Sequence, residues 1–230
     1  MLYKGSNSYN INSCETIEVF YNIRTDFEKL QYASLITKIV YDVTNENENS
    51  YKILQLFLNT LYKISETDMN LDLILSIFKI RLLSILGFRP HIDNCTNCKE
   101  EKNITHFSIK DNGFKCEVCS KLDKSAIKIS EGTVNAIKYI ILAPPKKLYS
   151  FTLSDECIKE LELVSKIYLN EKLEKEYKIW TKLFTKYKNH ILNPKSKRHK
   201  GMPYTKWYFI RISKIWQRTN FIISCNRFTF

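Results

Sequence analysis

Four cysteines in two C-x2-C pairs constrain this chain more than any other feature of its sequence. Cys95 and Cys98 form the first pair, Cys116 and Cys119 form the second, and 17 residues separate the pairs. A two-residue gap lets both sulfurs of a pair face one point, and the longer gap suits a ribbon that carries one pair on each of two turns. The spacing therefore predicts a tetrahedral zinc site. Because four thiolates close the coordination shell, the zinc is expected to be structural rather than catalytic.

Two other roles of paired cysteines fit the sequence less well. A thiol redox motif has one C-x2-C pair beside a strand-helix unit, whereas this chain has two matched pairs. Structural disulfides need an oxidising compartment, and we identify no signal peptide before these cysteines. Cys14, Cys157 and Cys225 have no His nearby in sequence and are expected to be buried or free surface thiols. His91 is expected to lie at the surface or beside the four ligands.

Apolar spacing predicts a mainly α fold. Residues 2–11 alternate weakly around a turn signal and are expected to form two short strands. Apolar residues at helical spacing follow, and helices are expected to begin near Asp26, Ser50, Asn70, Ser130 and Ser154. The buried side of the second of these helices is expected to include Tyr62, and the last helix is apolar at positions that include Leu163 and Ile167. No apolar stretch approaches the roughly 20 residues of a membrane span.

The third predicted helix is expected to be the centre of a helical bundle. It is apolar on most faces and stops at Gly87. Its Lys79 and Arg81 are expected to snorkel from the buried helix to solvent. The fold class is therefore a helical bundle into which a four-cysteine zinc ribbon, at residues 90–123, is inserted.

The charge of the chain is unevenly distributed. The 230 residues carry a formal net charge of +12, from 36 Lys and Arg residues and 24 Asp and Glu residues. Residues 178–230 contain 13 of these cations, none of the acids and all three tryptophans, so residues 1–177 contain 23 cations and 24 acids. Cations that alternate with aromatic rings suit contacts to nucleic-acid phosphates and bases. The alternative is an unfolded basic extension that binds any polyanion.

Four segments of the chain are similar to a known family, namely LYKGSNSYNINSCETIEVFYNIRTDFEKLQYASLI at 2–36, LLSILGFRPHIDNCTNC at 82–98, CEVC at 116–119 and the segment that begins at Ile129. Together they resemble the RecO family of bacterial DNA repair proteins. The resemblance covers about residues 2–177 and follows the family's order of strand, helices, ribbon and returning helix. In this family an N-terminal OB-fold, a small β-barrel, precedes a helical domain that carries the zinc ribbon.

The resemblance implies that the chain divides into three parts. Residues 1–14 are expected to be a remnant of the OB-fold, since the matching motif lies near the end of that barrel in the family. Residues 15–177 are expected to be the helical domain with its ribbon, and residues 178–230 a basic, Trp-containing tail that matches nothing in the family. Two strands cannot close a barrel, so residues 1–14 are expected to be marginal or to pack on the helices. A truncated relative without function is therefore one interpretation.

The resemblance also implies a function without catalysis. Members of the family mediate homologous recombination in the RecF pathway. They bind single- and double-stranded DNA, anneal complementary strands, and work with RecR and the single-strand-binding protein to load RecA in the bacterial cytoplasm, at the nucleoid. The zinc ligands carried over by motif are Cys95, Cys98, Cys116 and Cys119. The candidate DNA contacts in the tail are Lys195, Lys197, Arg198, Lys200, Lys206, Trp207 and Arg211.

Two further expectations concern alternatives to this function. The helical body could instead be an interaction module that docks RecR or the single-strand-binding protein in an apolar groove, without binding DNA itself. An enzyme is not expected, because the sequence has no glycine-rich phosphate loop, no H-E-x-x-H and no nucleophile elbow. Asp155, Glu156, Glu160 and Glu162 are expected to be helix N-terminal charges and solvated faces. The ribbon is expected to pin two helices together, because acidic neighbours such as Asp111 offset its lysines, including Lys115.

Overall fold

The computed structural model describes residues 2–4, 9–11, 18–45 and 49–179, and most of these are helical. The helices are α1 (Tyr21–Thr25), α2 (Phe27–Val43), α3 (Tyr51–Glu66), α4 (Leu71–Ile85), α5 (Glu117–Ser120), α6 (Glu131–Leu142) and α7 (Asp155–Leu173). The strands are β1 (Leu2–Lys4), β2 (Tyr9–Ile11), β3 (Ile104–Ser108), β4 (Gly113–Cys116) and β5 (Ala126–Lys128). The mainly α fold predicted from the sequence is confirmed for this part of the chain.

The strands β1 and β2 pair in antiparallel fashion, with Leu2 opposite Ile11 and Lys4 opposite Tyr9. Two short strands were predicted within residues 2–11, and their origin in an OB-fold stays a prediction. The helical body and the ribbon belong to a separate compact unit that begins at Phe20. In the described ranges, no helix is both long and apolar enough to cross a membrane.

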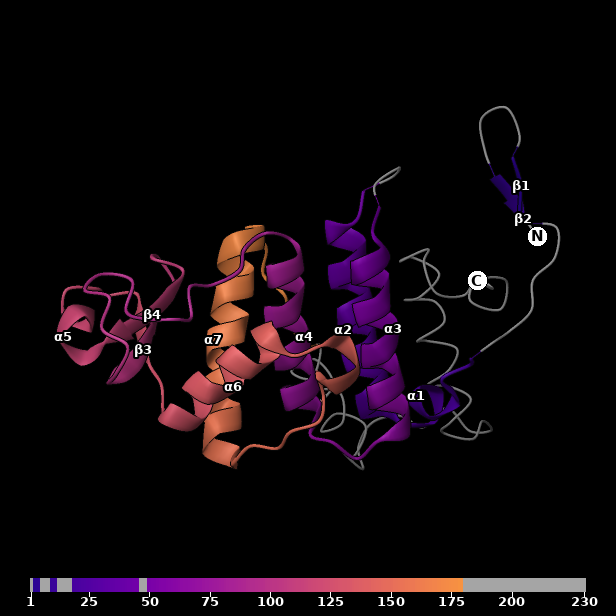
Figure 1. Ribbon diagram of the computed structural model, residues 1–230. Helices are drawn as coiled ribbons and strands as arrows, with labels where there is room; N and C mark the ends of the chain where they lie inside the picture. Colours follow the sequence, from indigo (N-terminus) through magenta and orange to yellow (C-terminus); the bar gives the residue numbers. More distant parts are fainter. Residues whose placement is uncertain (1, 5–8, 12–17, 46–48, 180–230) are drawn as a thin grey trace, which may run out of the picture. The chain divides into compact units, whose positions relative to one another are not determined.

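Helix α4 is the centre of the body, as its apolar sequence predicts (Figure 1). The side chain of Asn70 accepts hydrogen bonds from the amides of Asp72 and Leu73 and so caps the first turn. The eight residues from 73 to 80 are all buried, and α2, α3, α6 and α7 all pack against the helix. Gly87, at φ 94°, supplies the left-handed residue that ends it.

The two cations of α4 do not behave as predicted, because neither head group lies free in solvent. Arg81 Nη1 donates to the carbonyl oxygens of Ile140 and Ile141, at 3.0 and 2.6 Å, and so caps the C-terminal end of α6. Lys79 is only 4% exposed, and its burial lowers its pKa to about 8. The negative charge of Glu162 on α7 opposes this lowering of the pKa.

Three apolar side chains at helical spacing lie at the surface, and one of them, Tyr62, was predicted to be buried. Tyr62 of α3 is 50% exposed, and Leu163 and Ile167 of α7 are 48% and 38% exposed. Helical spacing shows where apolar residues recur along a helix but not which neighbours cover them. Helix α1 was not predicted, because its five residues are too few to show helical spacing of apolar side chains.

Replacing Lys79 with Met should stabilise the protein. The charged amine is buried at a cost, and Met keeps most of its volume without the charge, so we expect a gain of roughly 1–3 kcal/mol at pH 7. The pKa of Lys79 falls from 10.5 to about 8 on folding, so the unfolded chain binds more protons between these values and stability rises with pH there. Denaturation at several pH values should show that Lys79→Met lacks this contribution.

The control for this measurement is Lys38→Met, since Lys38 is an exposed cation on α2. It should change neither the stability at pH 7 nor its pH dependence. Destabilisation by Lys79→Met would instead mean that attraction between Lys79 and Glu162 outweighs the cost of burial.

Candidate metal centre

The four cysteines lie in a small ribbon between α4 and α6. Its sheet has the order β4-β3-β5 with antiparallel pairing throughout, and Phe107 of β3 lies opposite Phe114 of β4 and Ile127 of β5. His91 adds a parallel bridge to Gly113 on the free side of β4. A Cβ atom at Gly113 would lie 2.6 Å from the carbonyl oxygen of His91, so this close approach requires glycine.

Aromatic residues fix the ribbon to the helical body. The ring of Phe107 meets that of Tyr168 from α7 edge-to-face, with centroids 5.3 Å apart, and that of Phe114 at 6.1 Å. The Tyr168 hydroxyl donates to the carbonyl oxygen of Phe88 at 3.0 Å, just after α4. These contacts support the prediction that the ribbon ties helices together.

The first C-x2-C turn is held by backbone hydrogen bonds. The amide of Cys95 donates to the carbonyl of Glu100 and the amide of Lys99 donates to that of Cys95, at 2.8 and 3.0 Å. Lys99 has φ 63°, the left-handed conformation that lets the turn close. The amide of Thr96 donates to Phe114 of β4 at 2.9 Å, which joins this turn to the sheet.

The fold brings the four predicted ligands together. The sulfurs of Cys95, Cys98, Cys116 and Cys119 all lie within 4.8 Å of one another. The Cys98 and Cys116 sulfurs are 3.6 Å apart, which is far longer than a disulfide bond of about 2.05 Å. A zinc tetrahedron with Zn–S bonds of about 2.3 Å has edges of about 3.8 Å. The cluster therefore has the donor type and the spacing that suit zinc.

The electrostatics of the cluster also favour a cation. Burial opposes ionisation of Cys95, but the amides of Cys98, Cys116 and Asn97 donate to its sulfur and lower its pKa to about 6. Hydrogen bonds to the sulfurs of Cys116 and Cys98 raise the pKa of Cys119 to about 12. Four sulfurs this close resist losing all their protons, and a divalent cation removes that penalty.

His91 does not belong to the group of four cysteines. Its Nε2 atom is 2.8 Å from Oδ1 of Asn94, and its backbone pairs with β4. The four thiols therefore make a closed donor set that leaves no position for a substrate. Such a site can hold two turns of the chain together but does not activate water.

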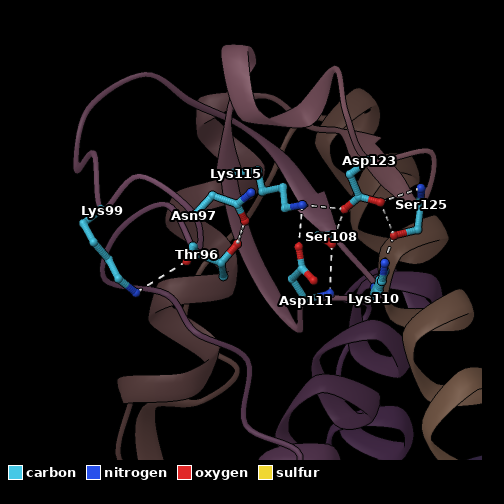
Figure 2. Close-up of polar contacts among 9 residues, drawn as sticks. All are labelled: Thr96, Asn97, Lys99, Ser108, Lys110, Asp111, Lys115, Asp123 and Ser125. Atoms are coloured by element: carbon cyan, nitrogen blue, oxygen red, sulfur yellow. Dashed lines mark hydrogen bonds and ion pairs between the residues drawn. The ribbon is translucent and has the colours of Figure 1, made fainter.

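A buried ion cluster beside the cysteines was not predicted (Figure 2). The Lys115 ammonium lies 2.5 Å from Asp111 and 2.8 Å from Asp123, and the lysine side chain is 3% exposed. Burial alone would lower the pKa of Lys115, but its hydrogen bonds to both carboxylates raise it. Asp111 is the acid expected to offset the charge of Lys115, and it does so by direct contact, together with Asp123.

A second polar cluster joins α6 to α7 and corrects the expectation for Glu160. This carboxylate is not a solvated charge, because its Oε2 atom accepts from the amide and hydroxyl of Ser130 and from the hydroxyl of Thr133, at 2.8, 2.7 and 2.6 Å. These hydrogen bonds outweigh the effect of burial and lower the pKa of Glu160. The sulfur of Cys157 lies 3.3 Å from the Ser130 hydroxyl. Glu160 therefore caps the N-terminus of α6 from another helix.

Comparison with known proteins places this architecture in a family. The family described as Recombination protein O C terminal matches residues 24–180, which contain the helical body and the ribbon. The chain belongs to the RecO family. The DNA repair protein RecO of Acetivibrio thermocellus is 43% identical over 178 residues, 77% of this chain and 71% of the relative. RecO proteins of Alkaliphilus metalliredigens and a Thermoanaerobacter species are each 29% identical and cover 76% and 77% of this chain, and 72% of each relative.

The other predicted sites of this RecO family member are not described by the structure. Cys14 and Cys225 lie outside the described residues, as does the whole set of candidate DNA contacts: Lys195, Lys197, Arg198, Lys200, Lys206, Trp207 and Arg211. Their role stays a prediction. In the described part, Cys157 is partly exposed and contacts Ser130.

We expect the purified protein to hold one zinc ion and to lose it on Cys116→Ser. Structural zinc contributes on the order of 10 kcal/mol to folding of its own loops, so the variant should loosen residues 90–123 and spare the helices. Elemental analysis gives the metal content, and amide hydrogen exchange locates the loosened segment. Cys157→Ser is the control and should keep the zinc. Absence of zinc from protein prepared without chelator would contradict the prediction.

Replacing Gly132 with Ala should destabilise the protein through one contact. Alanine favours a helix over glycine by about 1 kcal/mol, but its Cβ would lie 2.8 Å from the Cys157 sulfur. We expect a net loss of about 1 kcal/mol by chemical denaturation. In a Cys157→Ala background the same substitution should be neutral or stabilising. Equal effects in both backgrounds would show that the two helices do not approach this closely in solution.

Proposed function

We propose that this chain acts in DNA repair as a mediator of homologous recombination in the RecF pathway, and that it performs no chemistry of its own. The observation that carries this proposal is the family match over residues 24–180, together with relatives named DNA repair protein RecO. The proposed activity is to bind single- and double-stranded DNA and help load RecA onto single strands. RecR and the single-strand-binding protein are the proposed partners, in the bacterial cytoplasm at the nucleoid.

The proposed cofactor is one structural zinc ion on Cys95, Cys98, Cys116 and Cys119. The sulfur separations and the closed set of four thiols support it. When bound, zinc links the turn before β3 to the turn after β4. Its role is to hold the ribbon, which in turn contacts α7 through Phe107.

For DNA contact we propose the tail at residues 178–230, following the RecO-like domain at 15–177 and the OB-fold remnant at 1–14. The support is the charge distribution, since the tail has 13 cations and no acids. A near-neutral domain gives little attraction to phosphate, whereas each cation placed on a phosphate releases a counterion. Binding should therefore be independent of sequence and sensitive to salt.

A second candidate function is docking of RecR or the single-strand-binding protein without direct DNA binding. One observation favours it, which is a groove of about 560 Å³ between the end of α3 and the segment that precedes α7. Its apolar lining includes Met69, Leu73, Phe151, Leu153 and Ile158. Isothermal titration with either partner tests this function without DNA.

A salt titration of single-stranded DNA binding tests the tail. The tail variant replaces Lys195, Lys197, Arg198 and Lys200 with Gln in the full chain. It should bind more weakly, and the slope of log affinity against log salt should fall by roughly 2–3 units, at about 0.7 per lost phosphate contact. Fluorescence anisotropy at several salt concentrations measures both quantities.

The matched control makes the same change of charge on the ribbon. It replaces four exposed lysines, Lys99, Lys102, Lys121 and Lys124, with Gln. This variant should keep the affinity and slope of the wild type. Loss of binding in the control but not in the tail variant would place the DNA site on the ribbon, and no binding by the wild type would favour the docking function.

A further inference from the structure

The second C-x2-C turn has no apolar anchor. None of the four residues of α5, which carries Cys119, is buried. The apolar side chains of this segment face solvent instead, since Val118 is 75% exposed and Leu122 is 90% exposed. Hydrophobic burial therefore cannot fix the turn against the sheet. The first turn differs, because its Cys95 is buried and Thr96 is bonded to β4.

Asp123 fixes the segment that follows this turn. Its Oδ1 atom accepts from the amide and the hydroxyl of Ser125, at 2.8 and 2.7 Å, which closes the local turn. Its Oδ2 atom accepts from Ser108 of β3 at 2.5 Å and from Lys115 of β4 at 2.8 Å. One carboxylate thus ties the chain, four residues after Cys119, to two strands (Figure 2).

The hydrogen bonds extend to the β3–β4 turn on the same side. The Ser108 hydroxyl accepts from the amide of Asp111 at 3.0 Å, and the Ser125 hydroxyl accepts from the amide of Lys110 at 3.2 Å. The Asp111 carboxylate contacts the Lys115 ammonium from that turn. Figure 2 shows these groups converging around Lys115 and Asp123. Such a satisfied network specifies one position for the segment.

Lys115 connects this network to the cysteines. It directly precedes Cys116, whose sulfur belongs to the cluster and whose amide donates to the sulfur of Cys95. A fixed Lys115 therefore holds one ligand and one hydrogen bond to a second ligand. Asp123 acts from the other end, through the turn that follows Cys119.

We propose that the buried pair of Lys115 and Asp123 is a latch that positions Cys116 and Cys119 for the metal. Neither residue is a ligand, and both act through the backbone. The proposal rests on the proposed zinc site and concerns how tightly that site retains its ion. Residues that orient metal ligands typically change metal affinity by roughly 10- to 100-fold when they are replaced.

Simple electrostatics makes a different prediction for the same residues. Loading zinc onto four thiolates makes a centre with a charge of −2, which is more negative than the metal-free cysteines, so a nearby anion disfavours loading and a nearby cation favours it. On charge alone, Asp123→Asn should retain zinc better and Lys115→Met should retain it less well. A latch predicts that both variants lose zinc faster, because either change breaks the same contact.

The experiment measures zinc transfer from the full-length protein to the chromogenic chelator 4-(2-pyridylazo)resorcinol. We expect Asp123→Asn and Lys115→Met each to release zinc about tenfold faster than the wild type. The double variant should release it at about the same rate as the single variants rather than about 100-fold faster. Glu101→Gln removes an exposed ribbon acid and should not accelerate release. Thermal melting of the helical signal should be unchanged in all variants.

Amide hydrogen exchange over residues 117–126 separates this proposal from the zinc proposal itself. Exchange in this segment should rise in Asp123→Asn, whether or not the protein holds metal. The measurement therefore also tests the proposal in a variant that takes up little zinc. Zinc-free wild type with faster exchange in the variant would contradict the zinc site but retain the latch. Slower or unchanged zinc release by Asp123→Asn, with unchanged exchange, would overturn the latch.

Discussion

Burial of α4 on all its sides determines the arrangement of the body. Four helices pack around it, so no face of its central turns is left for solvent. Complete burial gives a large hydrophobic stabilisation, but it requires that every polar group carried into the core has a partner. Ser76 meets this requirement within the helix, since its hydroxyl donates to the carbonyl of Asp72 at 2.7 Å. Arg81 meets it by donating to α6. The need of the Arg81 side chain for hydrogen-bond partners thus produces a contact between α4 and α6.

Helix α6 shows how these polar contacts place the ribbon. Its N-terminal end is capped by Glu160 of α7 and its C-terminal end by Arg81 of α4. An acid at the N-terminus and a base at the C-terminus both favour the helix dipole. Because the ribbon leads directly into α6, fixing both ends of this helix also fixes where the ribbon returns to the body. Phe107 and Tyr168 then complete the contact from the side of the sheet.

Local sequence signals predicted much of the fold, whereas partners distant in sequence were not predictable. Asp26, Asn70 and Ser154 were identified as helix starts, and each side chain accepts from amides of the first turn. The four cysteines were identified because two short spacings bring each pair to one point. Ser130 and Glu160 are 30 residues apart on different helices, so no periodicity relates them. The same holds for Lys115 and Asp123, whose charges are ordinary in sequence and significant only once β4 and the turn after α5 meet.

The two faces of the ribbon sheet are stabilised by different interactions. Phe107 and Phe114 point to the side that packs on the helices, where burial of aromatic rings supplies the stability. Alternation along β3 and β4 places Ser108 and Lys115 on the opposite side, where hydrogen bonds replace apolar packing. Cys116 of the cysteine cluster lies where the apolar and polar faces meet, since it ends β4 directly after Lys115. An interaction that shifts either face thus acts on Cys116 through the same strand, which couples the cysteine cluster to the helical core.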